Sequence, residues 1–87
     1  MSGVEKLLER MRRSKAGWTY VDLDNLYRGL GFKVREGGKH RVYIHPRFLQ
    51  LRATVTRSRS LAKGYIKHAL GLADRLSELE AKHGKQC

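Results

Sequence analysis

The 87-residue chain has little cysteine, no long apolar run and few acidic side chains. Its one cysteine, Cys87, is the last residue, which excludes a disulfide or a cysteine metal site within the chain. No apolar run approaches the roughly 18 residues of a membrane span, and the N-terminal segment lacks the apolar stretch of a signal peptide. We therefore expect a cytoplasmic protein that does not act at a membrane.

The scarcity of acids narrows the catalytic options. Only eight Asp and Glu occur, and all but Glu36 lie on the predicted helices or their flanks. A two-metal nuclease needs several carboxylates that converge on its ions. The sequence also lacks a nucleotide-binding glycine motif and a His-Glu-x-x-His zinc motif. We expect no metal site and no small-molecule cofactor.

Positive charge is abundant and concentrated. The 19 Lys and Arg give the chain a formal net charge of +11. Between Lys33 and Lys67, ten basic residues stand against one acid, so this stretch alone carries +9. Neutralising phosphate groups with release of counterions requires clustered cations of this kind. The sequence predicts an anionic partner, and a merely solubilising surface is the alternative.

Helical spacing of apolar residues appears three times. The predicted helices cover residues 4–14, 19–30 and about 60–79. Thr19 and Asp22 have the spacing of a capping box, and Gly31 suits the left-handed turn that ends a helix. Ser60 is a suitable N-cap for the last helix.

From residue 32 the hydrophobic period changes to two, which predicts three strands, with a tight glycine turn over Gly37-Gly38-Lys39 between the first two. In this interpretation Val34, Val42 and Ile44 face the core. The face toward solvent then carries Lys33, Arg35, Arg41, Tyr43, His45, Arg52, Thr54 and Thr56.

The resulting fold class is α+β, with a three-stranded antiparallel sheet, helices packed on one face, and an extra short N-terminal helix. This is the element order of the double-stranded-RNA-binding domain. We expect one domain over 1–87, with a core over 18–79, a helical extension over 1–17 and a frayed tail over 82–87. The order of elements alone does not establish a function.

One pattern in the chain resembles a known family. A strand follows a helix, a glycine turn is followed directly by histidine, and the next strand closes in His45-Pro46. Together with the segment 63–66 at the start of the last helix, this pattern resembles HicA toxins over about residues 18–79. The family usually reads Gly-Ser-His at the turn. Here Gly38, Lys39 and His40 stand there, so lysine replaces the usual serine.

The resemblance implies a metal-independent mRNA endoribonuclease, the toxin of a type II toxin–antitoxin system, with His40 as the catalytic residue and a HicB-type protein as antitoxin. A free imidazole, with a pKa of about 6.5, can accept the proton of a ribose 2′-hydroxyl or protonate the leaving oxygen. Lys39 and Arg41 would hold the scissile phosphate. Lys63 and Gly64 would add a second anion site at the N-terminus of the last helix.

The other expected RNA contacts are Lys33, Arg35, Tyr43, His45 and Arg52. Tyr43 could stack on a base or be an ordinary strand tyrosine. His45 could contact phosphate, although a structural role is favoured, and we expect His68 to be a solvated residue of the last helix. A non-catalytic RNA-binding module is the alternative function. A DNA-binding regulator is less well supported, because no helix carries clustered basic residues.

Overall fold

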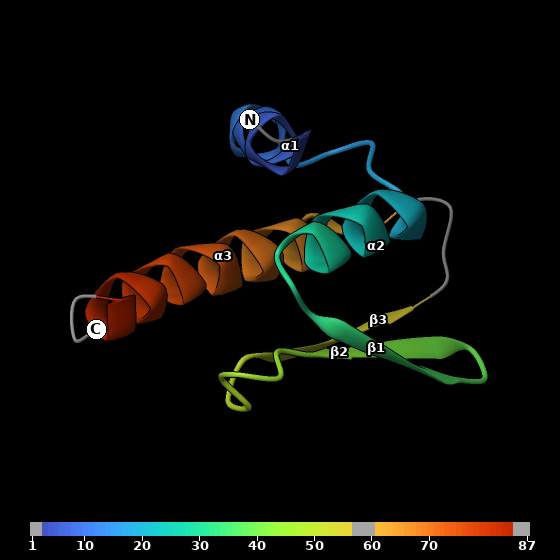
Figure 1. Cartoon of the computed structure of the whole chain (residues 1–87). Helices are drawn as coiled ribbons and strands as arrows, with labels where there is room; N and C mark the ends of the chain where they lie inside the picture. The colour runs from blue at the N-terminus through green and yellow to red at the C-terminus, as the bar shows by residue number, and fades with distance from the viewer. Residues whose placement is uncertain (1–2, 57–60, 85–87) are drawn as a thin grey trace.

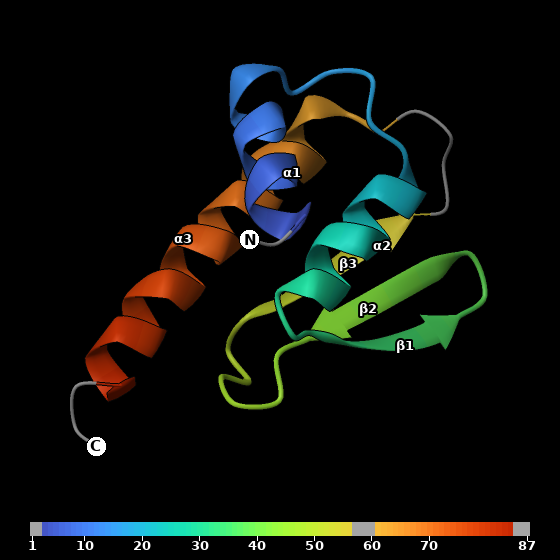
Figure 2. The same cartoon turned by 45° about the horizontal axis from the view of Figure 1, so that its top comes forward.

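The computed structural model describes residues 3–56 and 61–84. The order of elements is α1 (Gly3–Arg13), α2 (Tyr20–Gly29), β1 (Lys33–Gly37), β2 (His40–Ile44), β3 (Arg52–Thr56) and α3 (Lys63–Gly84). The strands form an antiparallel sheet in the order β1-β2-β3. Both α2 and α3 lie on one face of the sheet, and α1 packs on the far side of these helices (Figure 1, Figure 2). The predicted α+β fold is confirmed, and it is compatible with the double-stranded-RNA-binding arrangement.

Local sequence signals set both ends of α2. The Thr19 hydroxyl accepts from the backbone N–H of Asp22 at 3.3 Å, and the Asp22 carboxylate accepts from the backbone N–H of Thr19 at 2.9 Å. At the other end Gly31 has a φ of 95°, a conformation in which glycine carries no steric penalty. The backbone N–H of Phe32 then donates to the Tyr27 carbonyl at 2.9 Å, and the chain turns into β1.

The long helix differs slightly from the prediction at both ends. It begins at Lys63, and the expected N-cap Ser60 lies outside the described residues. At the other end the helix continues to Gly84, so residues 82–84 are helical where the sequence predicted a frayed tail.

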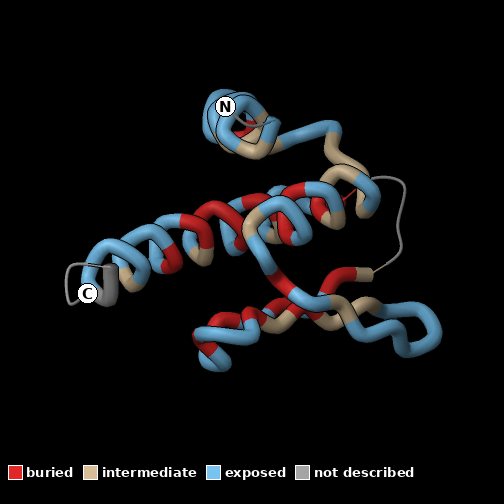
Figure 3. The backbone as a smooth tube through the Cα atoms, viewed as in Figure 1, coloured by how far each residue is buried: buried red, intermediate tan, exposed pale blue. Residues whose placement is uncertain are grey.

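The core lies between the sheet and the helices and extends between α1 and the pair α2 and α3; its buried positions are red in Figure 3. The rings of Tyr27 on α2 and Tyr43 on β2 stack with their centroids 4.7 Å apart. Met11 on α1 is 0% exposed, so α1 contributes to this core and is more than an appended extension. Burial of an aliphatic side chain of this size contributes about 1.5–3 kcal/mol.

Strand β2 faces the opposite way from the prediction. Its register places Tyr43 between Val34 of β1 and Ala53 of β3, and residues paired in this way share one face. Tyr43 is 0% exposed and points toward the helices. Val42 and Ile44 therefore lie on the outer face of the sheet.

The predicted solvent-facing positions of Arg41, Tyr43 and His45 are thus wrong. The cause is the length of the turn. Gly37 pairs directly with His40, which leaves a turn of two residues where the sequence was read with three. A shift of one residue transfers every side chain of a strand to the other face.

His45 is part of the core. The residue is 3% exposed, and its ring meets the Phe32 ring edge-on, with centroids 5.2 Å apart. The Nδ1 atom accepts from the backbone N–H of Arg47 at 3.2 Å. A phosphate cannot reach the ring while this packing holds, so the structural role considered for His45 is the one that fits.

The contact between α1 and α2 yields a test. A Cβ at Gly29 would overlap a methyl group of Val4, whereas a Cβ at Gly71 of α3 would meet open space. We expect Gly29→Ala to lower the free energy of unfolding by about 1–3 kcal/mol through overpacking. Gly71→Ala should raise it by up to about 1 kcal/mol through helix propensity. Urea unfolding measures both, and a stabilising Gly29→Ala would contradict the close packing.

Candidate functional site

The outer face of the sheet brings together four of the predicted site residues, Lys33, Arg35, His40 and Arg52. No described helix covers this face (Figure 1). Cross-strand pairing arranges its side chains in three rows, because directly paired residues share a face. The rows are Lys33–Ile44–Arg52, Arg35–Val42–Thr54 and Gly37–His40–Thr56. All of the charged groups in these rows are basic.

His40 is exposed at the first position of β2, the middle strand. It lies between Gly37 and Thr56, neither of which has a bulky side chain. The preceding turn has Gly38 at a φ of 61°, which favours glycine, and brings the exposed Lys39 next to His40. The imidazole is therefore open to a ligand that approaches the sheet from solvent.

The cations of this surface have no acidic partners among the residues that the structure describes. Lys33, Arg35, Lys39 and Arg52 are all exposed, and none forms an ion pair within the described part of the chain. From residue 37 to residue 73 the sequence contains no Asp or Glu. The positive charge of the outer face is therefore available to an anionic ligand.

Arg41 does not join this group. Its guanidinium lies on the helix side of the sheet, 3.1 Å from Asp24 and 3.3 Å from Glu36, and over the ring of Tyr20 at 5.5 Å. These contacts hold the half-buried Arg41 side chain on the helix side of the sheet. The prediction that Arg41 lies beside His40 at the scissile phosphate is therefore wrong.

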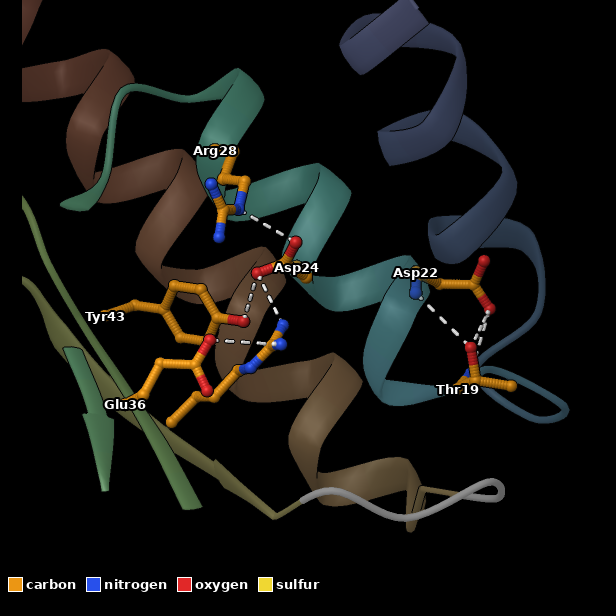
Figure 4. Close-up of polar contacts among 7 residues, drawn as sticks. Thr19, Asp22, Asp24, Arg28, Glu36 and Tyr43 are labelled. Atoms are coloured by element: carbon orange, nitrogen blue, oxygen red, sulfur yellow. Dashed lines mark hydrogen bonds and ion pairs between the residues drawn. The ribbon is translucent and has the colours of Figure 1, made fainter. Parts of the chain in front are cut away.

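The same side of β2 carries a polar network centred on Asp24 (Figure 4). The Tyr43 hydroxyl donates to Asp24 Oδ1 at 2.6 Å, and Arg28 Nε donates to Oδ2 at 2.8 Å. Burial alone would raise the pKa of Asp24. The hydrogen bonds from Tyr43 and Arg28 and the charges of Arg28 and Arg41 outweigh it, so that the pKa lies below its usual value. Asp24 is a carboxylate at neutral pH.

Tyr43 serves this network and does not reach the surface. Burial, followed by its hydrogen bond to Asp24, raises the pKa of Tyr43 to about 12. The phenol is therefore neutral at physiological pH and is 0% exposed. Of the two roles considered for Tyr43, stacking on a base does not fit its burial, and the ring anchors β2 to α2 as a strand residue.

A hollow of about 350 Å³ lies beside β3, where α3 begins. Its lining residues are Thr54, Ala62, Gly64, Tyr65 and His68. The Nε2 atom of His68 is 3.4 Å from the carbonyl oxygen of Arg52, which connects α3 to the edge strand. The predicted anion-binding pair, Lys63 and Gly64, is exposed at this position.

His68 is the site residue that the sequence missed. Helical spacing identified it as an exposed helix residue, which is correct, but the strand beside it could not be read from that spacing. To identify His68 as a site residue, one has to know that α3 runs along β3, which is a feature of the tertiary fold.

A larger hollow, of about 550 Å³, lies along α1, and its lining includes Glu5 and Glu9.

Within residues 3–56 and 61–84, no group of three or more His, Cys, Asp or Glu is placed to hold a metal ion. Nor does that part of the chain contain a helix long and apolar enough to span a bilayer. Arg57 and Arg59, which add to the basic stretch of the sequence, lie outside the described residues.

Asp24→Asn tests the inward orientation of β2. The change should lower the free energy of unfolding at pH 7 by about 1–3 kcal/mol, because the Tyr43 hydroxyl and Arg41 lose a charged partner. The folded pKa of Asp24 lies below the unfolded value of about 3.9. Its contribution is therefore present above that value and is lost as the pH falls through the lowered folded pKa.

Urea unfolding of wild type and Asp24→Asn between pH 7 and pH 3 measures this effect. We expect the difference between the two proteins to shrink at acidic pH. Asp74→Asn is the control, because Asp74 pairs with Arg12 at the surface and should matter by less than about 1 kcal/mol. A difference that stays constant over this pH range would contradict the network.

Comparison of the chain with models of protein families, with curated proteins and with solved structures finds no match. The resemblance to HicA toxins therefore stays a prediction. The assignment of a function rests on the exposed His40, the acid-free basic face around it and the hollow beside β3.

Proposed function

We propose that the protein is a metal-independent endoribonuclease that cleaves mRNA, acting in the cytoplasm as the toxin of a type II toxin–antitoxin system. His40 is its catalytic residue. The observation that carries the proposal is the exposed imidazole of His40 on a sheet face whose charged side chains are all basic. The resemblance of residues 18–79 to HicA toxins supplies the class of reaction.

The chemistry requires one proton acceptor beside a bound phosphodiester. His40 accepts the proton of the ribose 2′-hydroxyl, and the 2′-oxygen attacks phosphorus as the bond to the 5′-oxygen breaks. The imidazolium or a water molecule then protonates the leaving oxygen. The products are a 2′,3′-cyclic phosphate and a 5′-hydroxyl end, and DNA is not a substrate because it lacks the 2′-hydroxyl.

The cations around His40 stabilise the negative charge that grows on the phosphate oxygens. Lys39 is next to His40 in the chain, and Arg35 lies one row away on the same face. Preorganised positive groups of this kind provide the electrostatic part of catalysis. In this proposal Lys39, which stands where typical HicA toxins have a serine, contacts the phosphate through its ammonium group.

An antitoxin that silences this enzyme has to cover His40 or the basic face. Charge complementarity favours a HicB-type partner that presents acidic side chains to Lys33, Arg35 and Arg52. The same surface would then bind RNA and antitoxin in competition.

The central test is cleavage of mRNA by the purified protein in the presence of EDTA. We expect His40→Ala to reduce the rate by about 10²–10⁴-fold, the usual contribution of a general acid or base, while RNA binding is retained. Mass spectrometry of the fragments should find cyclic phosphate ends. Cleavage by His40→Ala at the wild-type rate would defeat the assignment.

The basic face is tested by a matched pair of arginines. Arg35 lies on the outer face and Arg75 on α3, and both are exposed without an ion pair among the described residues. We expect Arg35→Ala to weaken RNA binding and to reduce the slope of log K against log salt by about one. Arg75→Ala should change neither quantity. Equal effects of the two changes on RNA binding would contradict the binding of RNA at the outer face.

The alternative function is a non-catalytic RNA-binding module, which the same basic face favours. Both functions predict that Arg35→Ala weakens RNA binding, but they differ in whether the RNA is cut. The wild-type protein would bind with a steep dependence on salt but leave the length of the RNA unchanged over hours.

A further inference from the structure

The hollow between β3 and α3 adjoins the outer face of the sheet. Thr54 lines the hollow and also lies in the middle row of the outer face, beside Val42. Thr56, one row further, is paired with His40. Diagonal neighbours on adjacent strands are about 7–8 Å apart, so the rim of the hollow lies at about this distance from His40.

The lining of the hollow suits a flat, mostly apolar group with polar edges. Ala62, Gly64 and the half-buried Tyr65 provide apolar surface and an aromatic ring. The hydroxyl of Thr54 and the imidazole of His68 provide hydrogen-bonding groups at the same place. Proteins bind unstacked bases with this combination of an aromatic surface and a few polar side chains.

The charge around the hollow indicates that the flat group of the ligand carries an anionic group. Lys63 and Lys67 are exposed on the first turns of α3, and Arg52 is exposed on β3. No acid is among the described residues that line the hollow. By contrast, the lining of the larger hollow along α1 includes Glu5 and Glu9, which oppose an anion. A base that carries its phosphate fits the hollow beside β3 in both shape and charge.

We infer that this hollow is a base-binding subsite that holds one unpaired nucleobase of the RNA strand lying across the outer face. The inference rests on the proposed action on RNA. It makes the protein selective for single-stranded RNA, because a base within a duplex stays stacked and cannot enter. The hollow then contributes to the choice of cleavage site, since it fixes a nucleotide near the one presented to His40.

Two glycines of α3 provide a matched test. A Cβ at Gly64 or at Gly71 would meet nothing within 4 Å, and both residues are exposed, so both accept a side chain. Only Gly64 lines the hollow. Gly64→Leu therefore fills the subsite, and Gly71→Leu is the control for an added side chain on the same helix.

Binding is measured in a His40→Ala background, which keeps the RNA intact. The probes are a single-stranded RNA oligonucleotide and an oligonucleotide of the same length and charge built from abasic ribose units. We expect Gly64→Leu to weaken binding of the normal oligonucleotide about ten-fold, the scale of one lost base contact, and to leave the abasic one unchanged. Gly71→Leu should leave both affinities unchanged. Circular dichroism confirms that each variant is folded.

Equal binding of the normal oligonucleotide by Gly64→Leu and Gly71→Leu would overturn the inference. So would concentration-dependent self-association of the wild type that Gly64→Leu abolishes, because the hollow would then hold a second copy of the chain. If His40-dependent cleavage occurs and Gly64→Leu leaves its sites and rates unchanged, the subsite is wrong and the proposed function stands. A wild-type protein that neither binds nor cleaves RNA would overturn both.

Discussion

The hydrogen bond from Tyr43 to Asp24 joins the middle strand of the sheet to α2 and decides which side of β2 meets the helices. The Tyr43 ring also stacks on Tyr27 of α2, so the residue is fixed by a polar contact and an apolar one. Side chains alternate along a strand. With Tyr43 inside, His40 has to lie outside, and the exposure of the candidate catalytic group follows from a buried interaction.

The two faces of the sheet differ in their charged side chains. On the helix side, Asp24 and Glu36 hold Arg41, which removes one cation from the surface. On the outer side the charged residues are all basic and have no acidic neighbour in the rows that they occupy. Because acidic residues are scarce in the sequence, the outer face of the sheet is positively charged. A positively charged face suits a polyanion such as RNA.

Much of the fold could be predicted because its signals are local. The capping box of Thr19 and Asp22 and the left-handed Gly31 fix the ends of α2 through neighbouring residues alone. The faces of β1 and β3 were also predicted correctly. In β3 the apolar residues lie on one side and the polar or charged residues on the other, whereas in β1 Val34 marks the inner side, which it shares with Glu36.

Strand β2 could not be read in this way, because both of its sides carry mixed residues. Tyr43 and His45 have polar atoms yet are buried, whereas Val42 and Ile44 are apolar and lie outside. Counting across a two-residue turn from Gly37 to His40 places Val34 opposite Tyr43 and would have given the correct face. Contacts such as Asp24 with Tyr43, or His68 with the edge of β3, depend on the tertiary fold and produce no periodic pattern in the sequence.

The most direct test of the account is a map of the RNA-binding surface by NMR. Amide shifts of the His40→Ala protein would be recorded during titration with single-stranded RNA. We expect the perturbed amides to belong to the outer-face rows of β1, β2 and β3 and to the first turn of α3, with α1 unaffected. Perturbations confined to α1 and the C-terminal half of α3 would contradict it.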